Sequence, residues 1–136
     1  MEILTLKIRI SMLWIFMAVL MSASMIIYLW GPGVLEEIMA GEMEGMKIST
    51  GFSLFMALFW LIPLVMAFLS VTLRGLANYR TNLTLGTIFL VFYIFHLMGH
   101  VIQRNLPIDH LVMCVLTIVL PALVIYYARQ LPKQEA

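Results

Sequence analysis

The chain has 136 residues, of which 63% are hydrophobic and 11% are charged, and its formal net charge at pH 7 is +1. An ordinary soluble domain carries about 25% charged residues, so this composition excludes that class and is typical of an integral membrane protein. The near-neutral charge also gives no electrostatic reason to expect nucleic acid as a partner.

Four apolar runs are long enough to cross about 30 Å of hydrocarbon as helices. None of them contains Asp, Glu, Lys or Arg, and they cover residues 11–30, 52–73, 83–103 and 111–128. Few residues remain for loops, so we expect a single membrane domain over residues 1–136. The predicted fold is an all-α bundle of four transmembrane helices.

The first run carries a stripe of large side chains on one helical face. At about 100° per residue, the stripe consists of Trp14, Met17, Met21, Met25 and Tyr28. Thioether ligands select Cu(I), so the stripe is open to interpretation as a copper path. The alternative is core packing, because methionine fills irregular apolar interiors.

A short amphipathic helix is predicted over residues 34–46, after Gly31-Pro32-Gly33 ends the first run. Its apolar positions follow a roughly helical period and are Leu35, Ile38, Met39, Met43 and Met46. Its other face is acidic, whereas helices that lie on a membrane surface usually carry a basic face. We therefore expect it to cover the mouth of the bundle or to face a partner.

Prolines interrupt the second and fourth runs at Pro63 and Pro121. Each should bend its helix and leave a carbonyl without its usual donor. Such bends serve helix packing or mark a ligand pocket, and a small apolar ligand between the bent helices is one hypothesis.

Polar side chains on the third run share one face. Tyr93, His96, His100 and Gln103 fall within an arc of about 80° at helical spacing. Polar groups at membrane depth face the protein interior or a partner. We therefore expect these four residues to form a ligand site, or to line the path of a small-solute transporter.

The histidines admit three interpretations. His96 and His100 with His110, which begins the fourth run, could bind a metal together with Glu42 or Glu44. A haem would need axial histidines from two facing helices, such as His96 or His100 with His110. The third interpretation is structural, with the histidines hydrogen-bonded to neighbouring helices. No cofactor follows from the pattern by itself.

The basic residues predict the orientation. Six of the eight lie on one side of the predicted membrane, namely Lys7, Arg9, Arg74, Arg80, Arg129 and Lys133. Lys47 and Arg104 lie on the other side. The positive-inside rule then places both termini and the expected 74–82 loop in the cytoplasm, with the protein in the cell membrane.

Catalytic patterns are missing from the runs. Their serines, such as Ser24 and Ser70, have no nearby acid or base in the sequence, so hydrolysis is unsupported and an enzyme is not expected. Antiport by a membrane-embedded carboxylate is disfavoured too, because the runs contain no carboxylate.

Several segments together resemble a family of small four-helix prokaryotic membrane proteins known only as a domain of unknown function. They are LWIFMAVLM, GPGVLEEIMAG, Gly45 to Ser49, Ile62-Pro63 with Met66 and Leu69-Ser70, and Asn78, Arg80 and Asn82. In that family an acidic residue tends to precede the Ile-Pro pair, and here Leu61 stands there. The resemblance implies the fold and no activity. We expect a non-enzymatic accessory or ligand-binding protein of the lipid bilayer, either as a homo-oligomer or in a larger membrane complex.

Overall fold

The computed structural model describes residues 2–102 and 108–131, with the backbone alone at residues 109 and 110. As the sequence predicts, four of its helices are long and apolar enough to cross a membrane, by length and composition. They are α1 (Ile3–Leu29), α3 (Thr50–Thr72), α4 (Gly75–Ile102) and α5 (Ile108–Ala128). Between α1 and α3 lie the short helix α2 (Val34–Met39) and a hairpin of β1 (Glu42–Met43) and β2 (Met46–Lys47).

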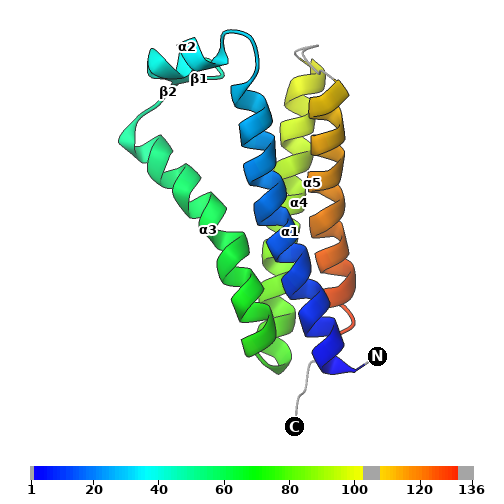
Figure 1. Ribbon diagram of the computed structural model, residues 1–136. Coiled ribbons are helices and arrows are strands. Elements are labelled where there is room, and N and C mark those ends of the chain that lie inside the picture. Colours follow the sequence, from blue (N-terminus) through cyan, green and yellow to red (C-terminus); the bar gives the residue numbers. More distant parts are fainter. Residues whose placement is uncertain (1, 103–107, 132–136) are drawn as a thin grey trace.

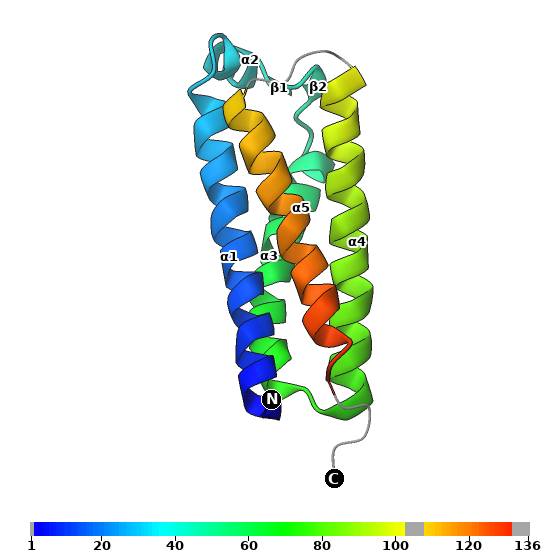
Figure 2. The ribbon, with the colours of Figure 1, turned by 90° about the vertical axis from the view of Figure 1, so that its right-hand side faces the viewer.

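The four long helices do not contact one another equally. Helix α1 packs along both α3 and α5, and α4 packs along α5, whereas α3 and α4 make far fewer contacts. We call the end where α1 begins and α5 ends the terminal end, and the end with α2 and the strands the hairpin end. Figure 1 shows that α3 lies close to the other helices at the terminal end and diverges from them toward the hairpin end. Figure 2, seen from the side, shows α5 between α1 and α4.

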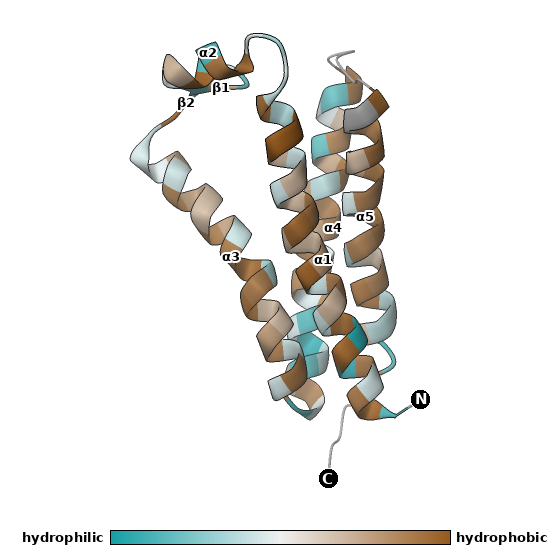
Figure 3. Ribbon diagram, in the orientation of Figure 1, coloured by the Kyte–Doolittle hydropathy of each residue, from teal (hydrophilic) through white to brown (hydrophobic). Residues whose placement is uncertain are grey.

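The buried core follows one face of α1. The fully buried positions Ile10, Trp14 and Met17 recur at helical spacing and pack with Met66 of α3 and Phe89 of α4. The outward faces are apolar as well, and Figure 3 shows hydrophobic colour along most of each long helix. A helix that is apolar all round suits a lipid environment, where the exterior contacts hydrocarbon.

The loop predicted over residues 74–82 is wrong, because α4 already begins at Gly75. Polar Asn78, Arg80 and Asn82 lower the hydropathy of this stretch. Yet the two asparagines are 1% and 0% exposed, and both form hydrogen bonds inside the protein. A hydropathy pattern identifies the part of a helix whose side chains are apolar. It does not identify helical turns whose polar side chains form hydrogen bonds inside the protein.

The helix predicted over residues 34–46 is also wrong in its second half, because α2 ends at Met39. Gly41 has a φ of +82°, and Glu44 and Gly45 have φ values of +51° and +73°. Two successive residues with positive φ produce the tight turn that joins paired strands. The apolar pattern did not reveal the hairpin, since Met43 and Met46 line one side of a cavity from strands as they could from a helix.

Candidate functional site

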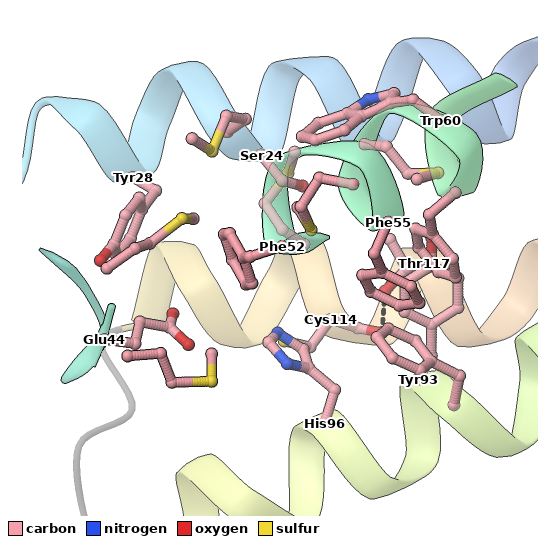
Figure 4. Close-up of a pocket in the computed structure, with 18 residues that line it drawn as sticks. Ser24, Tyr28, Glu44, Phe52, Phe55, Trp60, Tyr93, His96, Cys114 and Thr117 are labelled. Atoms are coloured by element: carbon pink, nitrogen blue, oxygen red, sulfur yellow. Dashed lines mark hydrogen bonds between the residues drawn. The ribbon is translucent and has the colours of Figure 1, made fainter. Parts of the chain in front are cut away.

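A cavity lies between the long helices at the hairpin end, where α3 diverges from the others (Figure 4). Its volume is about 420 Å³, within the range of about 300–1,000 Å³ that small-molecule sites usually occupy. All four long helices and the hairpin contribute to its wall. The cavity therefore has the size and position of a ligand site between helices.

Helix α1 supplies one side of the cavity from the stripe that the sequence predicts. Met21, Met25 and Tyr28 line the wall, while Trp14 and Met17 of the same stripe are buried closer to the terminal end. The inward placement of this stripe is confirmed. Met43 and Met46 reach the wall from the hairpin, whereas Met39 is 73% exposed. The copper hypothesis stays a prediction.

Aromatic rings of α3 and α4 close the cavity toward the terminal end. The Phe59 ring centroid lies 4.8 Å from that of Phe89 and 4.7 Å from that of Phe92. Phe52, Phe55 and Trp60 extend this aromatic surface along α3. Because α3 and α4 have few other contacts, these rings are the main link between the two helices beside the cavity.

Tyr93 is the most unusual residue of the wall. Its side chain is 6% exposed, and its hydroxyl is buried with no hydrogen-bond partner among the described residues. A buried polar group without a partner costs about 1–3 kcal/mol. The protein therefore carries a hydroxyl at its cavity wall that a ligand atom could satisfy.

The serine and threonine hydroxyls of the wall bond to their own helices. Ser24 Oγ donates to the Leu20 carbonyl at 2.9 Å, and Thr117 Oγ1 donates to the Cys114 carbonyl at 2.8 Å. Each of these oxygens can still accept a hydrogen bond. At the mouth, Glu44 lies next to Tyr28, and its carboxylate points toward the cavity in Figure 4.

The predicted stripe on the third run divides in the structure. Tyr93 and His96 line the cavity. His100 does not belong to the wall, and its ring contacts that of His96 at 4.6 Å between centroids, with the planes 86° apart. Gln103 lies outside the described residues. Two of the four predicted ligand-site residues, Tyr93 and His96, therefore line the cavity wall.

The predicted metal ligands are only partly brought together. Among the residues that the structure describes, no three His, Cys, Asp or Glu side chains form a group that could hold a metal ion. Glu44 lines the same cavity as His96, whereas Glu42 is exposed and pairs across the hairpin with Lys47. The side chain of His110 lies outside the described part, so the three-histidine metal site and the haem stay predictions.

The bent-helix hypothesis placed a small apolar ligand between the two proline-bent helices, and α3 and α5 both contribute to the cavity wall. Pro63 and Pro121 are both fully buried, and neither lines the cavity wall. Both prolines thus lie in packed regions of α3 and α5.

Sequence reasoning missed a buried polar network toward the terminal end. Trp14 Nε1 donates to Asn82 Oδ1 at 2.7 Å, and Ser70 Oγ lies 2.9 Å from the same oxygen. Asn82 Nδ2 donates to Asn78 Oδ1 at 2.6 Å. Asn78 Nδ2 in turn donates to the backbone carbonyls of Ser70 and Leu73, at 2.9 and 3.0 Å.

This network joins α1, α3 and α4 through side chains that are at most 1% exposed. One signal could have revealed it: Asn78 and Asn82 stand four residues apart, like His96 and His100. That spacing places two side chains on one helical face. The assignment of the stretch to a loop concealed the signal.

Comparison with known proteins gives one match. The model of a family of unknown function (DUF6326) matches residues 5–136. No curated protein and no solved structure matches the chain. The match agrees with the resemblance to an uncharacterised family noted from the sequence.

Proposed function

The chain belongs to the DUF6326 family of unknown function, and we propose that it binds a small, largely apolar molecule with one polar group in the cavity at the hairpin end. One observation carries the proposal: a cavity of about 420 Å³ with a mainly apolar wall is lined by Tyr93, whose buried hydroxyl has no hydrogen-bond partner among the described residues. Ligand sites commonly combine an apolar wall with a few polar groups that orient the ligand.

The chemistry of the wall favours an aromatic or cyclic ligand. Flat rings such as those of Phe55, Phe59 and Trp60 pack well against other rings, in offset or edge-to-face arrangements. The Tyr93 hydroxyl would donate to an oxygen or nitrogen of the ligand, which would remove the cost of leaving it without a partner. Binding of this kind requires no chemistry from the chain, in line with a non-enzymatic role.

The setting that we propose is the cytoplasmic membrane, with the four long helices crossing it as a bundle and both termini inside. Lipid chains would cover the exposed apolar faces, for example at Phe16, Phe68 and Phe95. Support for the orientation comes from the basic residues, because Lys7, Arg9, Arg74, Arg80 and Arg129 belong to the terminal end. Positive residues of short loops favour the cytoplasmic side.

Cysteine labelling in intact cells tests the orientation. In a Cys114→Ala background, a membrane-impermeant maleimide should label Lys47→Cys and leave Arg74→Cys unlabelled until the cells are opened. The reverse pattern would show that the hairpin end faces the cytoplasm.

The binding test uses 4-bromophenol, because its bromine quenches tryptophan fluorescence and Trp60 lines the cavity. The protein is placed in phosphatidylcholine nanodiscs and titrated with the phenol. We expect quenching that saturates, and that a Trp60→Phe variant largely lacks. Tyr93→Phe should weaken the apparent affinity about fivefold, the equivalent of one ordinary hydrogen bond.

Two serines of α1 provide a matched control. Ser22 and Ser24 both donate to the carbonyl four residues earlier, at 3.0 and 2.9 Å. Ser24 lines the cavity, whereas Ser22 is exposed. Ser24→Phe should fill the cavity and abolish saturable quenching, and Ser22→Phe should leave it intact. Quenching that does not saturate, or that survives Ser24→Phe unchanged, would rule the site out.

A further inference from the structure

The cavity wall changes character from its interior to its mouth. Toward the terminal end it is formed by aromatic rings and the Tyr93 hydroxyl, and at the mouth the hairpin contributes Met43, Glu44 and Met46. We infer that the ligand is a lipophilic cation, with its ring among the aromatic side chains and its positive group beside Glu44. This inference rests on the proposed ligand-binding function and names the ligand class.

Glu44 gives the cavity its charge. With histidine counted as neutral, it is the one formally charged residue among the described residues that line the wall. A cation in the cavity would therefore meet a single negative group, whose side chain is exposed at the mouth.

The hairpin turn holds Glu44 at this place. Glu44 and Gly45 both have positive φ, and the Gly45 N–H donates to Glu37 Oε1 at 2.9 Å. This bond occupies the Glu37 carboxylate at the turn and ties the hairpin back to α2. The Tyr28 hydroxyl beside the Glu44 backbone connects the turn to α1. The acidic residue is thus placed by backbone geometry at the mouth.

The walls are suited to a positive charge as well. Aromatic faces attract cations within about 6 Å of the ring centre, most strongly where water is excluded. Phe52, Tyr28 and His96 surround the space next to Glu44 in Figure 4, and Trp60 lies farther in. The combination of one carboxylate with several rings is the chemistry that recognises alkylated ammonium groups.

Other ligand charges fit the cavity less well. An anion would be repelled by Glu44 and would find no Lys or Arg among the described wall residues. A neutral ligand could fill the apolar part but would gain nothing from the carboxylate. The wall therefore discriminates by charge at its mouth and by shape farther in.

The experiment compares two probes of the same shape, benzyltrimethylammonium and its neutral isostere neopentylbenzene. Each competes with 4-bromophenol in phosphatidylcholine nanodiscs, and the relief of Trp60 quenching is measured. Glu44→Gln should weaken binding of the cation about three- to fivefold, as for a partly exposed ion pair. It should weaken binding of the neutral probe less than twofold.

Glu42→Gln is the matched control, because Glu42 belongs to the same hairpin, is exposed and does not line the cavity. It should change neither affinity. Equal sensitivity of the two probes to Glu44→Gln, or an unchanged affinity for the cation, would overturn the inference.

The experiment distinguishes a wrong ligand class from the absence of a binding site. If 4-bromophenol binds and Ser24→Phe blocks it, but the ammonium probe does not compete, the site stands and the cation inference fails. If 4-bromophenol itself shows no saturable quenching, the site fails and the inference fails with it.

Discussion

The two ends of the helical core connect the same helices in opposite ways. Toward the terminal end, hydrogen bonds between fully buried Trp14, Ser70 and Asn82 join α1, α3 and α4. Toward the hairpin end, the same helices surround a cavity, and the buried Tyr93 hydroxyl has no partner among the described residues. One end satisfies its buried polar groups and the other leaves one unsatisfied.

The difference has a physical meaning in an apolar environment. Lipid tails are as apolar as the side chains, so apolar contact does little to specify which helices associate. Hydrogen bonds between helices supply that specificity at the terminal end. Nearer the hairpin end, α3 meets α4 through the rings of Phe59, Phe89 and Phe92.

The largest expected effect comes from breaking the closed end with Asn82→Ala. The substitution removes the oxygen that accepts from Trp14 and Ser70, and it opens a small void. We expect a loss of about 3 kcal/mol of unfolding free energy, from the unpaired Trp14 N–H and the lost packing. Unfolding in mixed detergent micelles, followed by circular dichroism, measures it.

Thr87→Ala serves as the control for this change, because among the described residues exposed Thr87 bonds only to the Leu83 carbonyl of its own helix. It should change the unfolding free energy by no more than about 0.5 kcal/mol. A loss below about 1 kcal/mol for Asn82→Ala would mean that the network does not hold the terminal end together.

Two glycines on α4 allow the packing near the terminal end to be compared with the packing near the hairpin end. A Cβ at Gly86 would lie 3.1 Å from Ile125 Cγ1 and 3.3 Å from Val124 Cγ1, whereas a Cβ at Gly99 would meet no atom of the described residues within 4 Å. Gly86→Leu should lower the unfolding free energy by about 2 kcal/mol, because it forces α4 from α5. Gly99→Leu should change it by less than about 0.5 kcal/mol. Equal losses of unfolding free energy for the two variants in the same assay would show that α4 is packed as tightly at Gly99 as it is at Gly86.

Gly45→Ala tests whether the hairpin at the cavity mouth depends on the turn at Glu44 and Gly45. Because Gly45 has a φ of +73°, an alanine there should destabilise the turn by about 1 kcal/mol. Hydrogen exchange of the amides in residues 42–47 should become faster, and the long helices should be unaffected. Exchange that stays unchanged in the hairpin would show that the turn does not depend on glycine.

The smallest effect, and one of opposite sign, is expected from Tyr93→Phe. Removing a hydroxyl that has no partner among the described residues should leave the ligand-free protein as stable as before, or more stable by up to about 1 kcal/mol. The same variant should bind 4-bromophenol more weakly, which separates a ligand contact from a structural one. A clear loss of stability without ligand would show that the hydroxyl already has a partner.

Much of the fold could be predicted from the sequence because it depends on local pattern. The four apolar runs became α1, α3, α4 and α5, and the stripe from Trp14 to Tyr28 faces inward. The errors occurred where polar residues or positive φ values were involved. The polar side chains of Asn78 and Asn82 predict a loop where the structure has the first turns of α4. The apolar pattern predicts a helix through Gly41 and Gly45, where the structure has positive φ values.

The candidate site was predicted only in part. Tyr93 and His96 were identified by helical spacing, and both line the cavity. The aromatic rings of α3 were not identified as site residues. In an apolar run, the sequence cannot distinguish a ring that lines a cavity from a ring that faces lipid. Glu44 was proposed as a metal ligand, and its place at the cavity mouth became visible only with the hairpin turn.

The sequence by itself determined that the chain forms four long apolar helices and which face of α1 points inward. Both follow from composition and from the 3.6-residue period, which are properties of a single helix. Only the tertiary structure decided that α3 diverges from α4, that a cavity opens there, and that Trp14, Ser70 and Asn82 meet. These features depend on how helices distant in the sequence pack against one another, and no pattern within one helix specifies that packing.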